Sequence, residues 1–277
     1  MIQKRAPIAT ALFYLMAACF LVLFGFPFVL MLTMSVKSMP EYMAGNYWGL
    51  PQKLYFGNYQ KVLLSKFNIY FLNSALVALI SVTVTVVVAS LAAYVFAKMR
   101  FRGSGALLLL FVVGMMIPVH TTLIPIYQLT RRMHLTDNLL GLVGPYVSFG
   151  LPVAVYILTS FFKDIPKSIQ ESALIDGASQ FRVYRTIMLP MSTPAISTVA
   201  IFNFLYFWNE FIFALTLINS SSKKTLPLGM REFYGAEAVN IPGVLTAILI
   251  GSLPVILFYM FAQERVINGL AAGAIKG

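Results

Sequence analysis

The chain has 277 residues, of which 59% are hydrophobic and 10% are charged, and its formal net charge is +11. Soluble domains average about 25% charged residues, so this composition excludes an ordinary water-soluble domain and indicates a protein of the lipid bilayer. The basic residues are scattered over many polar segments and form no single stripe. This pattern argues against nucleic acid as a partner and favours attraction to the headgroups of membrane lipid.

Six apolar stretches are long enough to cross a membrane as helices. A spanning helix needs about 20 consecutive apolar residues. Five stretches are free of charge, and a sixth, residues 186–222, is interrupted by Glu210 alone. The five uncharged stretches are residues 6–36, 67–97, 103–130, 138–162 and 238–263. The sequence therefore predicts an all-α membrane protein with six transmembrane helices.

A short basic connection predicts the orientation of these helices. Lysine and arginine are divided almost evenly between the two sides, but Lys98, Arg100 and Arg102 crowd into one short loop. Short basic loops are retained on the cytoplasmic side. We therefore expect a multi-pass protein of the plasma (inner) membrane with both termini in the cytoplasm.

The first three spans and their connections differ in composition. Segment 37–66 mixes proline, glycine and aromatic residues, which predicts an ordered external loop that covers the outer mouth. Span 67–97 lacks proline and glycine, so we expect a helix despite its many valines and threonines. Within span 103–130, Pro118 and Pro125 predict a kink or an early end.

The polar segment 163–191 predicts two short helices that protrude into the cytoplasm. Asp164 can cap the start of the first helix, and Pro166 suits its first turn. Gly177 supplies the left-handed residue that commonly ends a helix, and a second helix is expected to begin at Ser179. One face of the first helix carries apolar residues four positions apart, namely Ile165, Ile169 and Ala173.

The spacing within this segment carries a resemblance to a known family. Its pattern consists of Glu171, Ala173, Gly177, Ile187, Leu189 and Pro190. It resembles the EAA loop of permease subunits in binding-protein-dependent ABC importers, with Ser172 where the family usually has alanine. Further matching positions are Asn73-Ser74, Tyr94, 101–103, 208–210, 225–229 and 269–277. From about Asn58 to the C-terminus the chain is similar to carbohydrate permeases of the second maltose type.

The resemblance implies a fold, a division of the chain and a set of partners. The fold would be the transmembrane domain of a type I ABC importer, with a first helix and external loop over 1–66 and a core over 67–277. The partners would be a second homologous permease, two ATPase subunits and an extracytoplasmic sugar-binding protein. The permease would perform no covalent chemistry and need no cofactor. Its function would be carbohydrate import, most simply of an oligosaccharide.

The coupling function that the resemblance implies for the EAA loop agrees with the side chains present. In the family this loop forms a helix that sits in a cleft of the ATPase. Glu171 and Asp176 can pair with cations on a partner, and the small Ala173 and Gly177 allow close approach. Exposed apolar contact is expected from Ile169, Ala173, Leu174 and Ile175. The alternative is an amphipathic helix that lies on the lipid headgroups.

The energy source distinguishes two classes of transporter. The chain contains no Gly-Lys dipeptide and hence no P-loop, so ATP hydrolysis would belong to another chain. An ion-coupled secondary carrier is the alternative, because Glu210, with His120 as a weak companion, lies within an apolar stretch. A channel without energy coupling leaves the EAA spacing unexplained. No metal site is suggested, because His120 and His134 have no cysteine or carboxylate cluster around them.

Polar residues of the fifth span are the candidates for the solute path. Trp208, Asn209 and Glu210 suggest an aromatic surface with polar partners, as carbohydrate recognition requires. Asn203 and Tyr206 can line the same path. The alternative is that these side chains, like Asn73 and Ser74, hold helices together by hydrogen bonds. The solute itself, sugar or other, is not identified by these residues.

Overall fold

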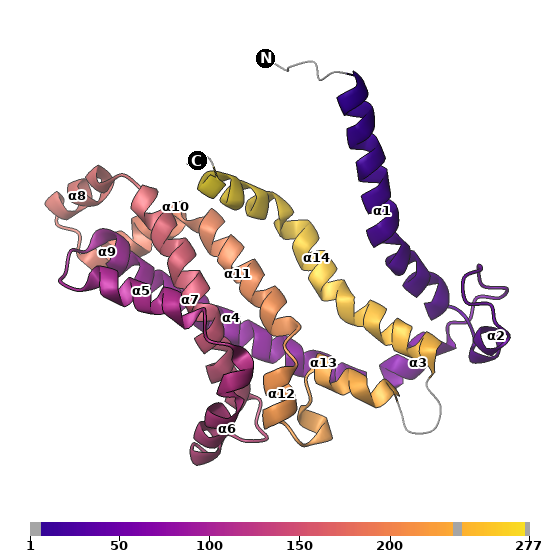
Figure 1. Cartoon of the computed structure of the whole chain (residues 1–277). Coiled ribbons are helices and arrows are strands. Elements are labelled where there is room, and N and C mark those ends of the chain that lie inside the picture. The colour runs from indigo at the N-terminus through magenta and orange to yellow at the C-terminus, as the bar shows by residue number, and fades with distance from the viewer. Residues whose placement is uncertain (1–6, 235–239, 275–277) are drawn as a thin grey trace. The chain divides into compact units, whose positions relative to one another are not determined.

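The computed structural model describes residues 7–234 and 240–274, with side chains described for 10–232 and 240–260. Helices are the regular secondary structure of these described residues (Figure 1). The first helices are α1 (Pro7–Ser35), α2 (Met39–Met43), α3 (Gly57–Leu64), α4 (Phe67–Lys98), α5 (Ser104–Gly114), η1 (Val119–Thr122), α6 (Leu123–Arg132) and α7 (Leu140–Asp164). They are followed by α8 (Lys167–Ile175), α9 (Gln180–Val183), the π-helix η2 (Tyr184–Met188), α10 (Leu189–Met191), α11 (Thr193–Trp208), α12 (Ile212–Leu217), η3 (Ser221–Lys223), α13 (Leu226–Gly229), η4 (Met230–Tyr234) and α14 (Ile241–Ala274). The all-α prediction is confirmed.

Four helices are long and apolar enough to cross a membrane by themselves. They are Thr10–Ser35 of α1, all of α4 and α7, and Ile241–Met260 of α14. Two further spans are pairs of helices bent at a short break, 97° between α5 and η1–α6 and 76° between α9–α10 and α11. When each bent pair counts as one span, the six predicted apolar stretches correspond to the spans of the structure.

Prolines mark both bends. Helix α5 ends at Gly114, and Pro118 lies just before the 3₁₀-helix η1 with ψ 132°, an extended conformation that interrupts the helical backbone. Proline has no amide hydrogen to donate and disfavours a helical conformation at the residue before it. The early end predicted for this span is thereby confirmed, while Pro125 lies in the first turn of α6. In the second pair, Ser192 lies between Pro190 and Pro194, and helix α11 begins at Thr193.

The chain separates into two compact units. The first comprises residues 1–68 and 230–252, and the second comprises 69–229 and 253–277. In the first unit, hydrogen bonds order the segment after α1. The ammonium of Lys37 is fully buried and donates to the backbone oxygen of Asn46 at 2.7 Å, and the Asn58 amide donates to the backbone oxygens of Ser35 and Lys37 at 3.0 and 2.8 Å. The segment is thus an ordered loop, as predicted.

In the second unit, α7 and α11 approach closely at Gly150. A methyl group added to Gly150 would lie 2.1 Å from Oδ1 of Asn203 and 2.7 Å from the ring of Phe207, so neither contact leaves room for a larger residue. One turn before, the ring of Tyr146 stacks on that of Phe207 with centroids 5.4 Å apart. The stacked rings of Tyr146 and Phe207 and the lack of a side chain at Gly150 together set the distance between α7 and α11.

Candidate functional site

The segment with the EAA spacing forms a short helix, a turn and a second helix, as predicted. Helix α8 begins after Pro166 and exposes Glu171 on its surface. The expected capping role of Asp164 is wrong, because α7 continues through Asp164 and Pro166 occupies the capping position without a side-chain hydrogen bond. At the second helix, the Ser179 hydroxyl accepts a hydrogen bond from the amide of Arg182 at 3.3 Å, so the predicted start at Ser179 is confirmed.

Gly177 closes α8 in the left-handed conformation, with φ +83°. The Gly177 amide donates to the oxygen of Leu174 at 3.1 Å, and the Ala178 amide donates to the oxygen of Ala173 at 2.9 Å. These two bonds form a Schellman motif, which satisfies carbonyls at the helix end and reverses the chain. The predicted glycine stop is therefore confirmed, and it fixes the direction in which α9 leaves.

The side chains of α8 and its neighbours divide into an exposed set and an inward set. Glu171, Asp176, Gly177 and Pro190 are exposed, and Ile175 is 85% exposed. The inward set packs partly buried against the core and consists of Ile169, Ala173, Leu174, Ile187 and Leu189. The expectation that Ile169, Ala173 and Leu174 offer free apolar surface is therefore wrong, because their face of α8 covers the core. The free apolar surface comes from Ile175 and from Phe181, which is 63% exposed.

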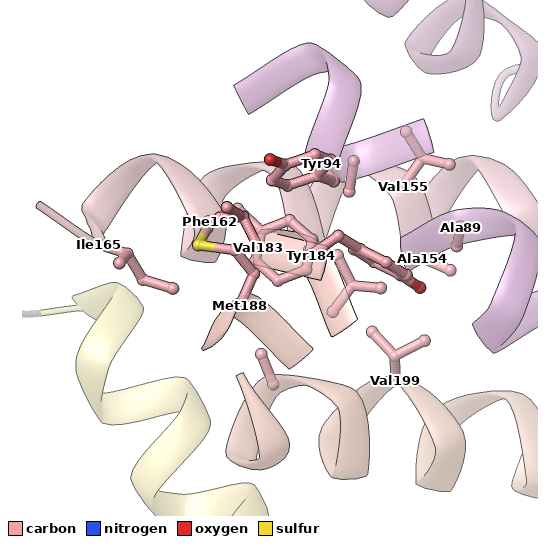
Figure 2. Close-up of a cluster of buried hydrophobic side chains, with 13 residues drawn as sticks. Ala89, Tyr94, Ala154, Val155, Phe162, Ile165, Val183, Tyr184, Met188 and Val199 are labelled. Carbon is pink, nitrogen blue, oxygen red and sulfur yellow. The ribbon is translucent and has the colours of Figure 1, made fainter. Parts of the chain in front are cut away.

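A buried apolar cluster supports this loop from below (Figure 2). It draws residues from α4, α7, α9, η2 and α11, and these helices meet beneath α8. Its members are Ala89, Ala93, Tyr94, Ala154, Val155, Leu158, Phe162, Ile165, Val183, Tyr184, Met188, Ala195 and Val199. Partly buried side chains of α8, η2 and α10 pack against this cluster, so the loop is seated on the spans by direct contact.

A cavity of about 510 Å³ lies within the second unit where α5 ends against α7 and α11. Asn203 and Tyr206 line it, together with Met115, Phe149 and Phe202. The break after α5 is part of its wall, and irregular backbone at membrane depth is tolerated where it lines such a cavity or is covered by protein. The cavity therefore presents aromatic faces at the bend of a broken span, while Asn203 is buried in its wall and donates to the backbone oxygen of Val199 at 2.9 Å.

The other candidate path residues lie elsewhere. Trp208 is 4% exposed and makes an edge contact with Phe71 at 5.3 Å between ring centroids. The Asn209 amide donates to the oxygen of Leu205 in its own helix at 2.8 Å. Glu210 is buried, and its carboxylate accepts hydrogen bonds from the amides of Phe213 at 2.8 Å and Ala214 at 3.3 Å. Glu210 thus supplies the negative charge that the first turn of α12 favours.

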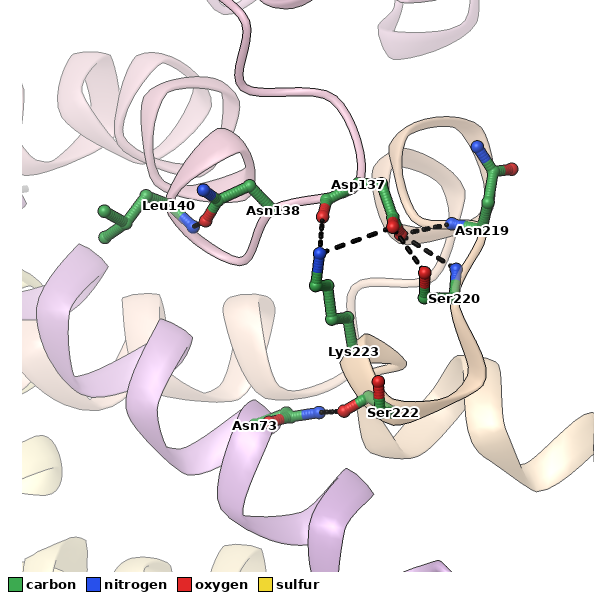
Figure 3. Close-up of polar contacts among 8 residues, drawn as sticks. All are labelled: Asn73, Asp137, Asn138, Leu140, Asn219, Ser220, Ser222 and Lys223. Atoms are coloured by element: carbon green, nitrogen blue, oxygen red, sulfur yellow. Dashed lines mark hydrogen bonds and ion pairs between the residues drawn. The ribbon is translucent and has the colours of Figure 1, made fainter.

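Asp137, which no expectation from the sequence named, holds two connections between helices together (Figure 3). Its carboxylate accepts hydrogen bonds from the amides of Asn219 at 3.0 Å and Ser220 at 2.8 Å and from the Ser220 hydroxyl. Lys223 donates to the backbone oxygen of Asp137 at 2.6 Å. The hydrogen bond from the Ser220 side chain, followed by that from its amide, holds the pKa of Asp137 well below its ordinary value.

The N-terminal part of α4 binds the same segment, between α12 and α13. The Asn73 amide donates to the backbone oxygens of Ser222 at 3.0 Å and Lys224 at 2.9 Å, and the Ser74 hydroxyl accepts from the amide of Leu226 at 2.7 Å. Asn73 and Ser74 therefore hold a loop to a helix by hydrogen bonds. This is a structural role and not the lining of a solute path.

We expect Asp137→Ala to lower the free energy of unfolding by about 1–3 kcal/mol, because charged hydrogen bonds to two amides are lost. Asp137→Asn should cost less, because the amide oxygen can still accept. The pKa of Asp137 is lowered in the folded state, so its stabilisation is present above about pH 3.9 and is lost as the pH falls through the folded-state pKa. Thermal unfolding in detergent should show a constant gap between wild type and Asp137→Asn from about pH 7 to 5. A gap that closes within that interval would contradict this assignment.

The described residues contain no group of three or more His, Cys, Asp or Glu that could hold a metal ion. What the second unit does contain is a supported protrusion at one end of its spans and a cavity between them. Such an arrangement suits the transmission of movement and the passage of a solute, and neither requires a reactive side chain.

Comparison with known proteins identifies the family. Residues 85–271 match the inner membrane component of binding-protein-dependent transport systems. The chain is 40% identical over 265 residues, 96% of each chain, to the ORF2 product of Caldicellulosiruptor sp. (strain Rt8B.4), which is named as an ABC transporter permease. It is 33% identical to the trehalose/maltose transport system permease protein MalG of Thermococcus litoralis, over 91% of each chain.

A solved structure shows the same fold. It is the crystal structure of a bacterial ABC transporter involved in the import of the acidic polysaccharide alginate, and one of its chains aligns with a TM-score of 0.83 at 21% identity. The alignment covers 95% of this chain and 98% of that one, which confirms the expected type I importer fold. With the family match over residues 85–271 and the identities of 40% and 33%, the chain belongs to the inner membrane component family of binding-protein-dependent transport systems.

Proposed function

We propose that this permease forms half of the translocation path of an ATP-driven carbohydrate importer and receives work from a separate ATPase at the EAA loop. The observation that carries the proposal is the exposed surface of Glu171, Ile175 and Asp176 on a helix seated on the core. An apolar side chain flanked by two carboxylates is suited to a partner with an apolar cleft and cationic rim. The similarity to a trehalose/maltose permease supports a sugar as solute.

The remaining features of the importer follow from the same proposal. The complete transporter contains a second homologous permease, two ATPase subunits and an extracytoplasmic sugar-binding protein. Both termini and the EAA loop lie in the cytoplasm, and the core of the permease begins near Phe67. Ala173, Gly177, Ile187, Leu189 and Pro190 shape the coupling loop, while Glu171 and Asp176 contact the ATPase.

The cavity beside the bend of the third span is the proposed contribution to the solute path. Tyr206 is 43% exposed and Phe202 44% exposed, so their rings are open to a solute. Aromatic rings can cover the apolar face of a sugar. Asn203 is buried and its amide donates to the backbone oxygen of Val199 at 2.9 Å, so we assign it to the support of this wall. Trp208, Asn209 and Glu210 support this wall from the end of α11 and the turn that follows it.

An ion-coupled carrier is the second candidate, and the contacts of Glu210 count against it. Both of its oxygens accept from backbone amides at the start of α12. A carboxylate committed to capping a helix is poorly placed to exchange a proton or a sodium ion at each cycle. His120, its suggested companion, is exposed on η1.

Uptake into membrane vesicles tests the energy source. Transport by an ABC importer should be stopped by vanadate and should survive a protonophore while ATP is supplied, and the reverse result would favour the carrier.

Contact with the ATPase is tested by cross-linking from Ile175→Cys, because Ile175 is 85% exposed. Position 173 is the matched control, because its side chain packs inward. Binding measurements on the cognate extracytoplasmic binding protein would identify the solute.

A further inference from the structure

Helix α4 touches each part of the EAA loop through one row of polar side chains. Ser90, Tyr94 and Lys98 are four residues apart and therefore lie on one face of the helix. The Ser90 hydroxyl is 2.8 Å from the hydroxyl of Tyr184 in η2. The Lys98 ammonium donates to the backbone oxygen of Ile165, just before α8, at 2.6 Å. One straight row of side chains thus holds the beginning and the end of the loop.

Tyr94, the middle residue of the row, takes part in a contact at which α4, α8 and α9 meet at one oxygen atom of Gln180. Oε1 of Gln180, at the start of α9, accepts a hydrogen bond from the Tyr94 hydroxyl at 2.6 Å and from the Gln170 amide at 3.2 Å. Tyr94 comes from α4 and is 3% exposed, and Gln170 comes from α8 and is 7% exposed. We call Tyr94, Gln170 and Gln180 the Gln180 junction. Gln180 itself is exposed, so water can partly replace its oxygen when the side chain is removed, and what is lost is the fixed direction of the two hydrogen bonds.

The backbone in the C-terminal part of the loop offers less resistance to bending. The π-helix η2 follows α9, and the chain bends by 76° between α9–α10 and α11. A π-helical turn is a poorly packed insertion that recurs at places of functional adjustment. Apolar packing beneath the loop is non-directional and permits some sliding, whereas hydrogen bonds fix an angle.

We propose that the Gln180 junction consists of positioning residues that fix the angle of α8 against α4, so that a displacement of α8 moves α4 instead of bending the loop. The inference rests on the proposed function, in which α8 is moved by an ATPase. Helix α4 is well suited to carry the displacement, because its 32 residues contain neither proline nor glycine. At about 1.5 Å per residue it reaches across the whole bilayer. Its far part holds the segment between α12 and α13 through Asn73 and Ser74.

The test uses the complete transporter in proteoliposomes and measures solute transported per ATP hydrolysed. Tyr94→Phe removes one donor, and Gln180→Leu removes the shared acceptor. Both should retain ATP hydrolysis within about twofold while the transport ratio falls by roughly fivefold to tenfold, as expected for one or two hydrogen bonds. Gln180→Glu keeps an accepting oxygen and should restore most of the ratio. Tyr156→Phe is the matched control, because Tyr156 is 55% exposed on α7.

The outcomes separate the junction from the proposed function. If the transporter with Gln180→Leu does not assemble, the transport ratios of Tyr94→Phe and Gln180→Glu are compared instead. A low ratio in Tyr94→Phe and a nearly normal ratio in Gln180→Glu would support the junction. A wild-type transport ratio in Tyr94→Phe, or an equal fall in hydrolysis and transport, would overturn the junction while leaving an ATP-driven importer. If the wild-type complex transports without ATP hydrolysis, the proposed function itself is wrong. Co-purification of the ATPase with every variant shows that docking is intact.

Discussion

Replacing Glu171 with lysine is expected to abolish ATP-driven uptake while the permease remains folded in the membrane. Glu171 is exposed on α8, and its carboxylate makes no hydrogen bond or ion pair within the described part of the chain. The substitution therefore removes no internal contact. In the proposed complex Glu171 faces a cationic rim on the ATPase. A lysine there would place like charges together at a cost of several kcal/mol, which would lower complex formation by more than about 100-fold.

The measurements for Glu171→Lys are uptake into vesicles and recovery of the ATPase with the purified permease. Glu171→Gln has nearly the same shape without the charge and is the matched control, with an expected loss of about tenfold or less. Thermal unfolding in detergent should be unchanged for both variants. Full uptake by Glu171→Lys would remove the carboxylate from the proposed docking surface.

Gly177→Asp is expected to abolish uptake for two separable reasons. The first is backbone conformation, because φ +83° costs most residues with a side chain about 1–2 kcal/mol, and aspartate, like asparagine, less than the others. The second is the surface. Among the described residues, apart from the immediate neighbours of Gly177, no atom lies within 4 Å of the position where a Cβ would be built, so a new carboxylate would project beside Asp176 into the surroundings. Uptake and ATPase recovery are again the measurements.

Three variants of Gly177 distinguish these causes. Gly177→Asn has the volume of aspartate without its charge and tolerates the left-handed conformation, so it should retain a substantial part of the uptake. Gly177→Ala adds the conformational cost with the smallest side chain. Gly177→Val combines that cost with a β-branch and should be the worst of the neutral variants. If all the neutral variants transport as poorly as Gly177→Asp, the backbone alone is responsible.

Local signals in the sequence predicted the local structure of the loop. Gly177 ends α8 and Ser179 begins α9, because a left-handed glycine and a capping hydroxyl act within a few residues. The six apolar stretches likewise correspond to spans, since length and composition decide insertion into lipid. Asp164 was misread because α7 extends beyond the apolar stretch, which periodicity does not reveal.

Long-range contacts were beyond the sequence for a physical reason. Asp137 binds Ser220, 83 positions away, and does so from a left-handed conformation with φ 52° that its sequence neighbours do not announce. The inward face of α8 was also misassigned, because the partner surface and the core compete for the same apolar residues. Ala173 packs toward the cluster and Ile175 points away from it. Only the position of the other helices determines which of these faces is covered.

The absence of a side chain at Gly150 limits how the permease can move. With Asn203 and Phe207 packed directly against that backbone, a side chain at position 150 would push α11 away from α7. We therefore expect the two helices to keep this spacing when the permease changes conformation. The bend after α5, where the helix is already interrupted, is then a more favourable place for rearrangement than the contact between α7 and α11.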